Sequence, residues 1–321
     1  MIDFKNARMW SLLGPNGAFG LAVQDLASSN MSVVVITADM RVYSGLNRFS
    51  EEYPDRFYNI GIAEENMLGV AAGMAKEGLN PFVTTYATFA AMRCADQIKV
   101  NMGYMKLPVK IVGLGAGFSM STFGSTHIAV EDVALMRAIP NVVILSPADC
   151  AEAIKATIAA AAVARPVYLR FTGGQGMPPV YKADYDFQIG KAIKLREGTD
   201  IAIIATGSMV YNSIKAAEML EVSGISASVV NMHTISPLDV SAVGEACRAK
   251  LIVTAEEHSK IGGLGSAVAE VLAPMKNKPQ QLILGVENFY PRAGSCKYLL
   301  EQYGLTPPGL ADSIRTFYKE F

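Results

Sequence analysis

Hydrophobic positions along the chain follow two alternating patterns. Short runs rich in β-branched residues, such as residues 32–37 (SVVVIT), predict buried strands. Longer stretches with apolar residues three and four positions apart predict helices, as at residues 64–76. By the same patterns, further strands are predicted at 81–85, 108–112, 142–145 and 166–170, and helices at 90–105 and 148–163. Continuous apolar strands that alternate with helices indicate a mostly parallel sheet covered on both faces.

The alternation stops at residues 172–188 (TGGQGMPPVYKADYDFQ), which are rich in Gly, Pro and Tyr and show no periodicity. A second series follows, with strands predicted at 200–205, 226–230, 250–254 and 281–285 and helices near 208–221, 239–248 and 265–272. We therefore expect a first domain at 1–172, a linker at 173–189 and a second domain at 190–321. The predicted fold class is α/β, with two open, mostly parallel sheets flanked by helices.

The composition is more apolar than the core of a small monomer requires. Hydrophobic residues make up 51% of the 321 residues and charged residues only 18%. This balance predicts a large core and further surface buried in an oligomer. The net charge of −1 argues against a nucleic-acid-binding protein, which is usually basic.

Targeting and redox signals are sparse. The four cysteines lie far apart and form no CxxC pair, which is typical of a reducing cytoplasm. The first ten residues, MIDFKNARMW, contain no apolar stretch of the signal-peptide type. The longest apolar run, at 158–164, is too short to span a bilayer. We expect a cytoplasmic protein without a membrane partner.

Several common motifs are absent. Gly113, Gly115 and Gly117 follow a predicted strand, but Phe118 stands where a dinucleotide-binding loop needs its third glycine. No P-loop, HExxH or GxSxG sequence occurs, and the three histidines lack the spacing of metal ligands. Residue counts alone leave a Ser–His–Asp triad open. We predict no metal ligands in this chain.

Three segments carry candidate chemistry: GIAEENM at 61–67, TTYATF at 84–89 and GSTH at 124–127. Each lies at the carboxyl end of a predicted parallel strand or in the loop that follows, the edge where open α/β sheets bind ligands. Glu64 and Glu65 begin a predicted helix, where acidic side chains also favour the helix dipole without any other role. The spacing alone does not decide between these two interpretations of Glu64.

These segments, followed by AVEDVALMRAIPNVVILSPAD and PVYLRF, resemble the pyrimidine-binding domain of the transketolase family. The later segments IIATGS, TISPLD and VTAEEHSKIGGLG resemble the C-terminal domain of the same enzymes. A complete transketolase carries an additional N-terminal domain with a GDG motif, which this sequence lacks. The chain therefore resembles the C-terminal subunit of a split transketolase.

The resemblance implies thiamin diphosphate as cofactor and assigns a role to each matching residue. Glu64 is the implied catalytic carboxyl at the pyrimidine ring, with Phe89 and Met92 in the wall around that ring. His127 is implied to act in catalysis and to contact the sugar oxygens, whereas Arg170 would bind a substrate phosphate. Phe123 takes the place of an aspartate that reads a sugar hydroxyl in relatives.

The resemblance also implies partners. An N-terminal subunit with the GDG motif would bind Mg²⁺ or another divalent cation together with the diphosphate. By analogy, two copies of this chain and two of that subunit would form a heterotetramer acting on sugars or sugar phosphates. Gly115 stands where relatives often have a phosphate-binding histidine, so with Phe123 it predicts a less polar substrate cleft and an unusual sugar.

Two alternatives to ketol transfer stay open. The chain could belong to another thiamin diphosphate enzyme, either a deoxyxylulose-phosphate-synthase-like enzyme or the beta subunit of a 2-oxo acid dehydrogenase. It could also be a non-catalytic assembly subunit. The presence of both Glu64 and His127 argues against that last alternative, because a scaffold needs no carboxyl group in the ring pocket.

Overall fold

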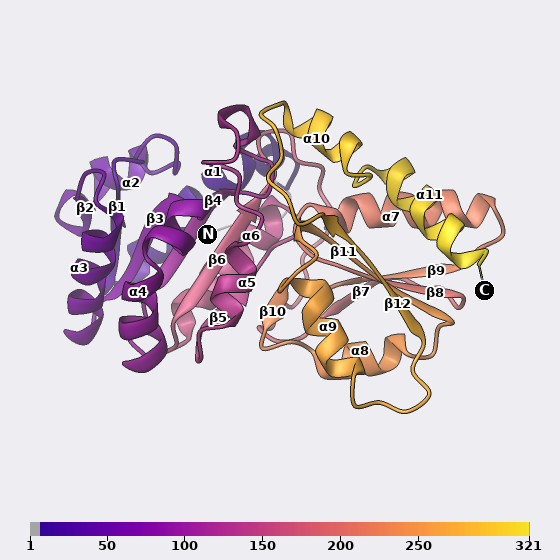
Figure 1. Cartoon of the computed structure of the whole chain (residues 1–321). Coiled ribbons are helices and arrows are strands. Elements are labelled where there is room, and N and C mark those ends of the chain that lie inside the picture. The colour runs from indigo at the N-terminus through magenta and orange to yellow at the C-terminus, as the bar shows by residue number, and fades with distance from the viewer. Residues whose placement is uncertain (1–6, 321) are drawn as a thin grey trace.

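The computed structural model describes residues 7–320 and contains two sheets that lie side by side (Figure 1). The first sheet has the strand order β10 (Thr234–Ser236), β5 (Val143–Leu145), β6 (Val167–Thr172), β4 (Lys110–Ala116), β3 (Asn80–Tyr86), β1 (Val33–Thr37) and β2 (Phe57–Asn59). All its strands are parallel except β10, which runs antiparallel to β5. The predicted strands of this sheet are confirmed, while β2 and β10 were not predicted.

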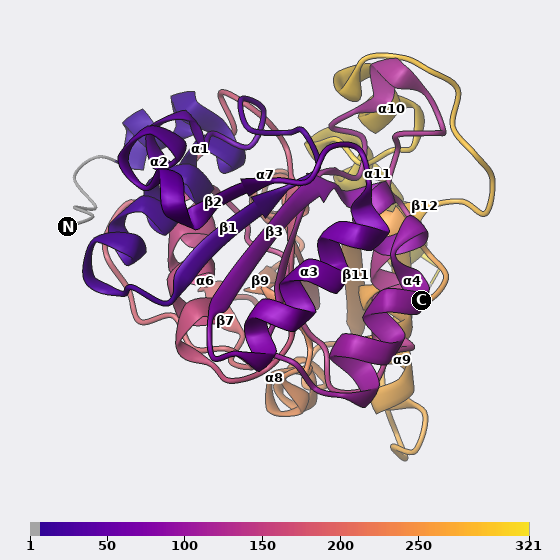
Figure 2. The same ribbon diagram turned by 90° about the vertical axis from the view of Figure 1, so that its left-hand side faces the viewer.

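Helices cover both faces of the first sheet, as its apolar strands require (Figure 2). One face packs against α1 (Ala7–Ser29), α2 (Asn47–Glu52) and α6 (Cys150–Ala162). The opposite face packs against α3 (Glu64–Lys76), α5 (Asp132–Arg137) and a helical segment at 89–104. Residues of β1 alternate between the two cores: Val33 and Val35 face α1, whereas Ile36 faces α3.

The segment at 89–104, predicted as one α-helix, consists of three pieces. Two π-helical turns, Phe89–Arg93 and Ile98–Tyr104, flank the short α4 (Ala95–Gln97). Cys94 separates the first turn from α4 and has φ −93° and ψ 12°, outside helical geometry. A π-turn contains an extra residue and is frequent at functional sites. Here the first such turn carries Phe89.

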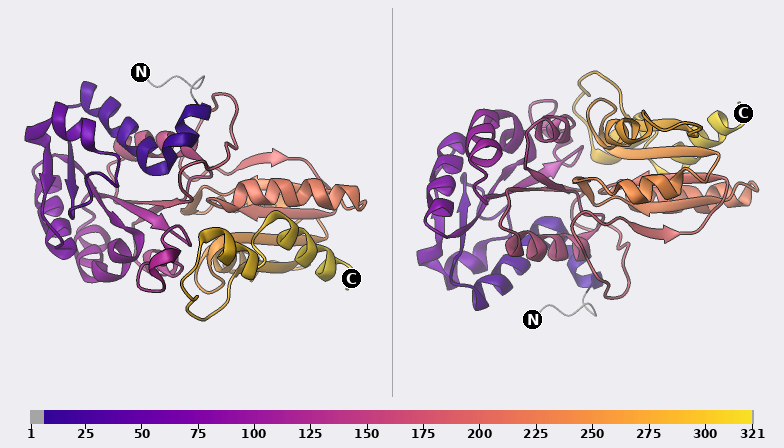
Figure 3. Two further views of the ribbon diagram at one scale, coloured as in Figure 1. Left: turned by 90° about the horizontal axis from the view of Figure 1, so that it is seen from above. Right: turned by 90° about the horizontal axis from the view of Figure 1, so that it is seen from below.

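The second sheet has the order β12 (Gln280–Val286), β11 (Leu251–Ser259), β8 (Ile201–Ala205), β9 (Ala227–Asn231) and β7 (Ile193–Arg196). Only β7 is antiparallel to its neighbour. One face packs against α7 (Met209–Val222), α10 (Cys296–Gln302) and α11 (Pro307–Tyr318), and the other against α8 (Val240–Ala246) and α9 (Leu264–Leu272). Figure 3 shows this layered second domain beside the first. The predicted fold class, two open and mostly parallel sheets flanked by helices, is confirmed.

Hydrogen bonds join the two sheets and the segment between them. Asp149 caps α6 and also accepts hydrogen bonds from the backbone N–H groups of Val180 and Tyr181, at 2.7 and 2.9 Å. Asn231, on β9 of the second domain, donates to the Tyr181 hydroxyl at 2.7 Å and to the buried Glu152 carboxylate at 2.9 Å. Residues 173–189 are therefore held against both domains, and the domain limits drawn from the sequence stay a prediction. No helix within residues 7–320 has the length and apolar character to cross a membrane.

Candidate active site

The start of α3 directs one carboxylate inward. The chain turns at Gly61, which has φ +77°, and the Asn59 side chain accepts a hydrogen bond from the Gly61 N–H at 3.0 Å. α3 then begins at Glu64, which is only 2% exposed, whereas Glu65 is exposed. Consecutive helical residues point about 100° apart, so only the first of the two carboxylates reaches the interior.

The buried Glu64 carboxylate lies against β3 and the first π-turn. Its Oε2 atom is 2.7 Å from a guanidinium nitrogen of Arg93, and its Oε1 atom accepts a long hydrogen bond from Thr85 at 3.4 Å. The Arg93 guanidinium also lies over the Phe89 ring, 4.2 Å from the ring centroid. Glu64, Arg93 and Phe89 thus form one contiguous group at the carboxyl end of β3.

Aromatic rings extend this group toward His127. The His127 ring lies 5.2 Å from Phe89, 5.5 Å from Tyr86 and 5.0 Å from Phe123, measured between centroids. The Thr126 hydroxyl is 3.0 Å from His127 Nδ1. Phe123 is 59% exposed, and Phe89 and His127 are partly buried. The structure therefore brings together Glu64, Phe89, His127 and Phe123, which the sequence places in three separate segments.

Three residues of this cluster were missed by the sequence analysis. Arg93 follows Phe89 by four positions, a spacing that places side chains on one helical face and could have indicated the contact. Tyr86 lies within the TTYATF segment, and Tyr43 packs against it with ring centroids 5.1 Å apart. Burial raises the pKa of both tyrosines, so they stay neutral hydrogen-bonding groups near pH 7. Nothing in the sequence pattern marks Tyr43.

The site lacks room for a histidine at position 115. Gly115 has φ +66°, and an added Cβ atom would lie 2.5 Å from Met120 Cγ. The Tyr43 hydroxyl contacts the Met120 sulfur at 2.8 Å. The space that a side chain at 115 would need is therefore filled by Met120, next to a tyrosine. The expectation of a less polar substrate cleft stays a prediction.

Arg170 is not part of the cluster, and its predicted role needs correction. It is 1% exposed, and its Nε atom lies 2.8 Å from the equally buried Asp132 carboxylate. Its other donors reach the carbonyl oxygens of Ala129 and Glu257 at 3.1 and 3.0 Å. A guanidinium enclosed in this way cannot bind a substrate phosphate, so Arg170 is a structural residue at the domain junction.

Asp132, the partner of Arg170, is held as a carboxylate. Burial opposes its ionisation, but the charges of Arg170 and His258 and hydrogen bonds from Arg170 and Tyr168 lower its pKa below the usual range. The Tyr168 hydroxyl donates to the same carboxylate at 2.7 Å. Met92, by contrast, is 45% exposed, and its predicted contact with the cofactor stays a prediction.

The cluster has the chemistry that an aminopyrimidine ring requires. A carboxylate buried beside partly buried aromatic rings offers a hydrogen-bonding group for a ring nitrogen and apolar surfaces for the ring faces. Glu64 and Phe89 would hold the pyrimidine part of thiamin diphosphate in this way. Between residues 7 and 320 no three His, Cys, Asp or Glu side chains are grouped as metal ligands.

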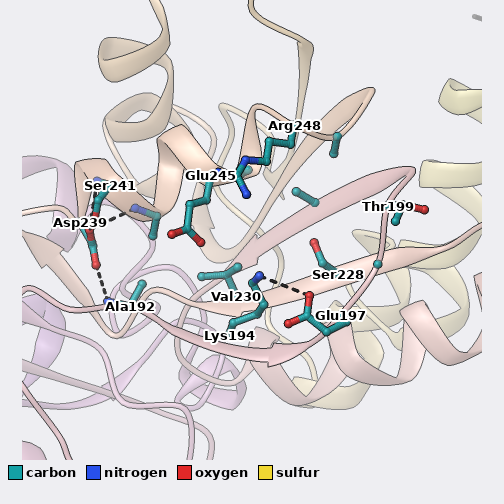
Figure 4. Close-up of a pocket in the computed structure, with 15 residues that line it drawn as sticks. Ala192, Lys194, Glu197, Thr199, Ser228, Val230, Asp239, Ser241, Glu245 and Arg248 are labelled. Carbon is teal, nitrogen blue, oxygen red and sulfur yellow. Dashed lines mark hydrogen bonds and ion pairs between the residues drawn. The ribbon is translucent and has the colours of Figure 1, made fainter.

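A separate cavity lies in the second domain (Figure 4). It has a volume of about 370 Å³ and lies between β7, β9 and α8. Among its charged groups, Lys194 pairs with Glu197 at 3.3 Å, and Asp239 accepts hydrogen bonds from backbone N–H groups at the start of α8. No residue of the cluster around Glu64 lines this cavity, so the candidate active site lies in the first domain.

Comparison with known proteins identifies both domains. A family profile described as transketolase, pyrimidine binding domain, matches residues 16–177. A second, described as transketolase, C-terminal domain, matches residues 190–310. The cluster around Glu64 lies within the first of these two matches.

Two transketolase subunits match this chain over most of their length. The chain is 40% identical over 286 residues to a 6-deoxy-6-sulfo-D-fructose transketolase subunit of Clostridium sp. (strain MSTE9), covering 88% of this chain and 87% of the relative. It is 35% identical over 298 residues to one of the subunits of an apulose-4-phosphate transketolase of Phocaeicola vulgatus, covering 92% and 95% of the two chains.

A solved structure matches equally well. It is described as a split gene transketolase, inactive beta4 tetramer, with a TM-score of 0.86 and 40% identity over 95% of this chain and 97% of that one. The two domain matches, the relatives and this structure agree with the geometry of the cluster. The chain therefore belongs to the transketolase family, in which it corresponds to the C-terminal section that contains the pyrimidine-binding and C-terminal domains.

Proposed function

We propose that this chain is the C-terminal subunit of a two-chain transketolase that transfers a two-carbon ketol unit from a ketose to an aldose. The observation that carries the proposal is the Glu64 carboxylate, which is 2% exposed and lies in a cluster with Phe89 and His127. When bound, thiamin diphosphate supplies a stabilised carbanion at its thiazolium carbon. The substrates are sugars or sugar phosphates.

In this proposal each side chain has a distinct task. Glu64 shares a proton with the far nitrogen of the pyrimidine ring, and its burial keeps water from competing for that hydrogen bond. Phe89 supports the ring, with Met92 at its exposed margin. His127 donates a hydrogen bond to a sugar oxygen and orients the donor, while its ring is held between Phe89 and Phe123.

The sugar is proposed to be an unusual one. Phe123 offers no hydroxyl acceptor beside His127, and Met120 fills the space at position 115. Both features favour a donor with fewer hydroxyl groups at these positions or with a bulkier substituent. The names of the two relatives, which refer to a sulfo-sugar and to apulose phosphate, support a family branch with such substrates.

The proposal includes an obligatory partner. This chain offers the pyrimidine half of the cofactor site, and we propose that the diphosphate and the divalent cation are bound by an N-terminal subunit that contains the GDG motif. The relative described as an inactive beta4 tetramer supports the need for a second kind of subunit. A second copy of this chain and a second copy of the partner would complete a heterotetramer.

The test is calorimetric titration of thiamin diphosphate with Mg²⁺ into this chain, into the partner and into their mixture. We expect tight binding and ketol transfer only in the mixture. Binding and ketol transfer by this chain alone would overturn the requirement for a partner. Release of CO₂ from pyruvate, without ketol transfer between sugars, would favour the synthase-like or dehydrogenase alternatives. A mixture that assembles but shows neither binding nor activity would favour an assembly role.

A further inference from the structure

The loop that carries His127 is closed at its base within the first domain. We call residues 117–130, which connect β4 to α5, the histidine loop. Gly117 and Ala129 pair across its base through two backbone hydrogen bonds of 2.8 and 3.3 Å. Phe123 and His127 lie beyond this pair, on the part of the loop that the first sheet does not hold.

The second domain holds the histidine loop through the end of β11. Glu257 Oε1 accepts a hydrogen bond of 2.6 Å from the backbone N–H of Phe118. Two residues later on the same strand, the Ser259 N–H donates to the carbonyl oxygen of Val130 at 2.7 Å. Strand β11 of the second domain is thus hydrogen-bonded to both ends of the histidine loop.

Glu257 fits this position closely. Its side chain is 2% exposed, and its second carboxylate oxygen contacts the Ser208 hydroxyl. A Cβ atom at Gly117 would lie 2.4 Å from Glu257 Oε1, and Gly117 has φ +63°. Only glycine allows the loop to approach the carboxylate in this conformation.

The outer part of the loop is held by the same domain. Ser121 Oγ donates to the carbonyl oxygen of Gly294 at 2.8 Å, and Ser125 Oγ donates to that of Pro291 at 2.7 Å. Both acceptors lie in the segment between β12 and α10, which Figures 1 and 2 show beside this loop. The Phe118 ring stacks on Tyr303 with centroids 5.3 Å apart.

We propose that Glu257 is a positioning residue for His127, through which the second domain sets the place of the histidine loop in the active site. The proposal rests on the proposed function for the role of His127 toward substrate. The side-chain hydrogen bonds of Glu257 go to Phe118 of the histidine loop and to Ser208, and not to Glu64, Phe89 or Arg93, so we expect it to affect donor binding and to leave cofactor binding unchanged. Without an acceptor at this point the buried Phe118 N–H loses its partner, and the loop gains other conformations.

The test compares Glu257→Ala with Glu257→Gln in the full chain, alone and assembled with its partner. Hydrogen exchange of the loop amides should become about tenfold faster or more in Glu257→Ala, with protection elsewhere retained. The KM for the ketose donor should rise by a similar factor, while the cofactor Kd stays within about twofold. Glu257→Gln should restore both properties, because its amide oxygen can accept from Phe118 and its NH₂ group can face Ser208.

A matched control is available on the same strand. Glu256 is equally buried, but it caps α9 by accepting from the N–H groups of Leu264 and Gly265 at 2.7 and 2.8 Å. Glu256→Ala should increase exchange near α9 and leave the histidine loop protected. If Glu257→Ala speeds exchange equally in both domains, or leaves the loop and the donor KM unchanged, the positioning role is wrong.

A second variant covers the case in which Glu257→Ala does not fold. Ser125→Ala removes one anchor from the outer, partly exposed side of the loop, and it should speed exchange at residues 121–128 and raise the donor KM. If the hydrogen exchange of the loop amides and the donor KM are both unchanged in Ser125→Ala, the second domain does not position the histidine loop. The exchange readout does not depend on turnover. If the wild-type assembly shows no ketol transfer, the proposed function is wrong, but the effect of Glu257 on the histidine loop can still be measured by hydrogen exchange.

Discussion

A guanidinium nitrogen of Arg93 lies 2.7 Å from the Glu64 carboxylate. The arginine side chain is 38% exposed, whereas the glutamate side chain is 3% exposed. The guanidinium group is therefore partly solvated, whereas the carboxylate is shielded from water. Because part of the Arg93 side chain is exposed, water can solvate its guanidinium group when that group moves away from Glu64. Arg93 can therefore move aside when a ring nitrogen approaches the carboxylate, whereas the buried Glu64 side chain stays in place.

Glu64→Gln should keep the fold and abolish proton exchange at the thiazolium carbon in the assembled enzyme. The amide fills nearly the same volume, but it cannot take up and return a proton at the pyrimidine nitrogen. The measurement is deuterium exchange at that carbon, followed by NMR after acid quench.

Glu65→Gln is the control for charge at the same helix start. Glu65 is exposed, so the substitution should change stability by no more than about 0.3–1 kcal/mol and leave exchange nearly intact. Equal loss in both variants would mean that a general charge effect, rather than the buried carboxylate, governs the reaction.

Phe123→Asp should shift relative turnover toward donors with the ordinary hydroxyl pattern. The new carboxylate would stand beside His127, where Phe123 now lies 5.0 Å from the imidazole, and it would accept a hydrogen bond from a sugar hydroxyl. The measurement is kcat/KM for a panel of ketoses. Val222, at the end of α7, is 91% exposed and lies outside the histidine loop and the segment that holds it, so Val222→Asp should leave the profile unchanged.

Arg170→Met should lower the free energy of unfolding by about 3–5 kcal/mol, because it leaves the buried Asp132 carboxylate without its cation. Adding Asp132→Asn should recover part of the loss. Urea unfolding of the single and double variants measures both effects. Unchanged stability together with a KM rise limited to phosphorylated substrates would restore a phosphate-binding role for Arg170.

The Asp149 contacts predict a pH-dependent stability. Burial raises the pKa of Asp149 from 3.8 to about 6, against the three backbone N–H groups that favour its charged form. Because the folded protein holds this proton more tightly than the unfolded chain, the contribution to stability is complete below about pH 4 and is lost as the pH rises through about 6. The advantage of wild type over Asp149→Asn should therefore be larger at pH 4.5 than at pH 7.5.

Urea unfolding at several pH values measures that difference directly. Subtracting the variant from the wild type removes the contributions of other groups, including Lys110, whose pKa burial lowers to about 7. A difference that grows with pH would show instead that the backbone donors hold Asp149 as a carboxylate.

Local sequence patterns predicted most strands, most helices and the edge at which the site forms. They did so because buried parallel strands and amphipathic helices leave a periodic record, and because ligand-binding loops follow strand ends. Glu64 and His127 were found through their segments and lie in one cluster. The strands β2, β7 and β10 and the helices α1, α2, α10 and α11 were missed. Strands as short as β2 and β10, with three residues each, leave no period to detect, and α1 is interrupted at Gly14 and Pro15.

The errors concern side chains whose surroundings come from distant parts of the chain. Arg170 follows a strand end as a ligand-binding residue would, but its burial depends on Asp132 of α5 and on the Glu257 carbonyl of β11. No local pattern records those two contacts. Tyr43 likewise joins the site only because β1 and β3 are neighbours in the sheet.

The pairing of β10 with β5 has a consequence for where a gene for such an enzyme can be divided. The chain leaves the first sheet after β6, builds part of the second domain and then returns Thr234–Ser236 to the free side of β5. A break near residue 190 would give one product with an uncovered edge at Val143–Leu145 and another with an unpaired strand, an arrangement that favours aggregation. The two domains of this chain are therefore expected to be encoded together in one gene.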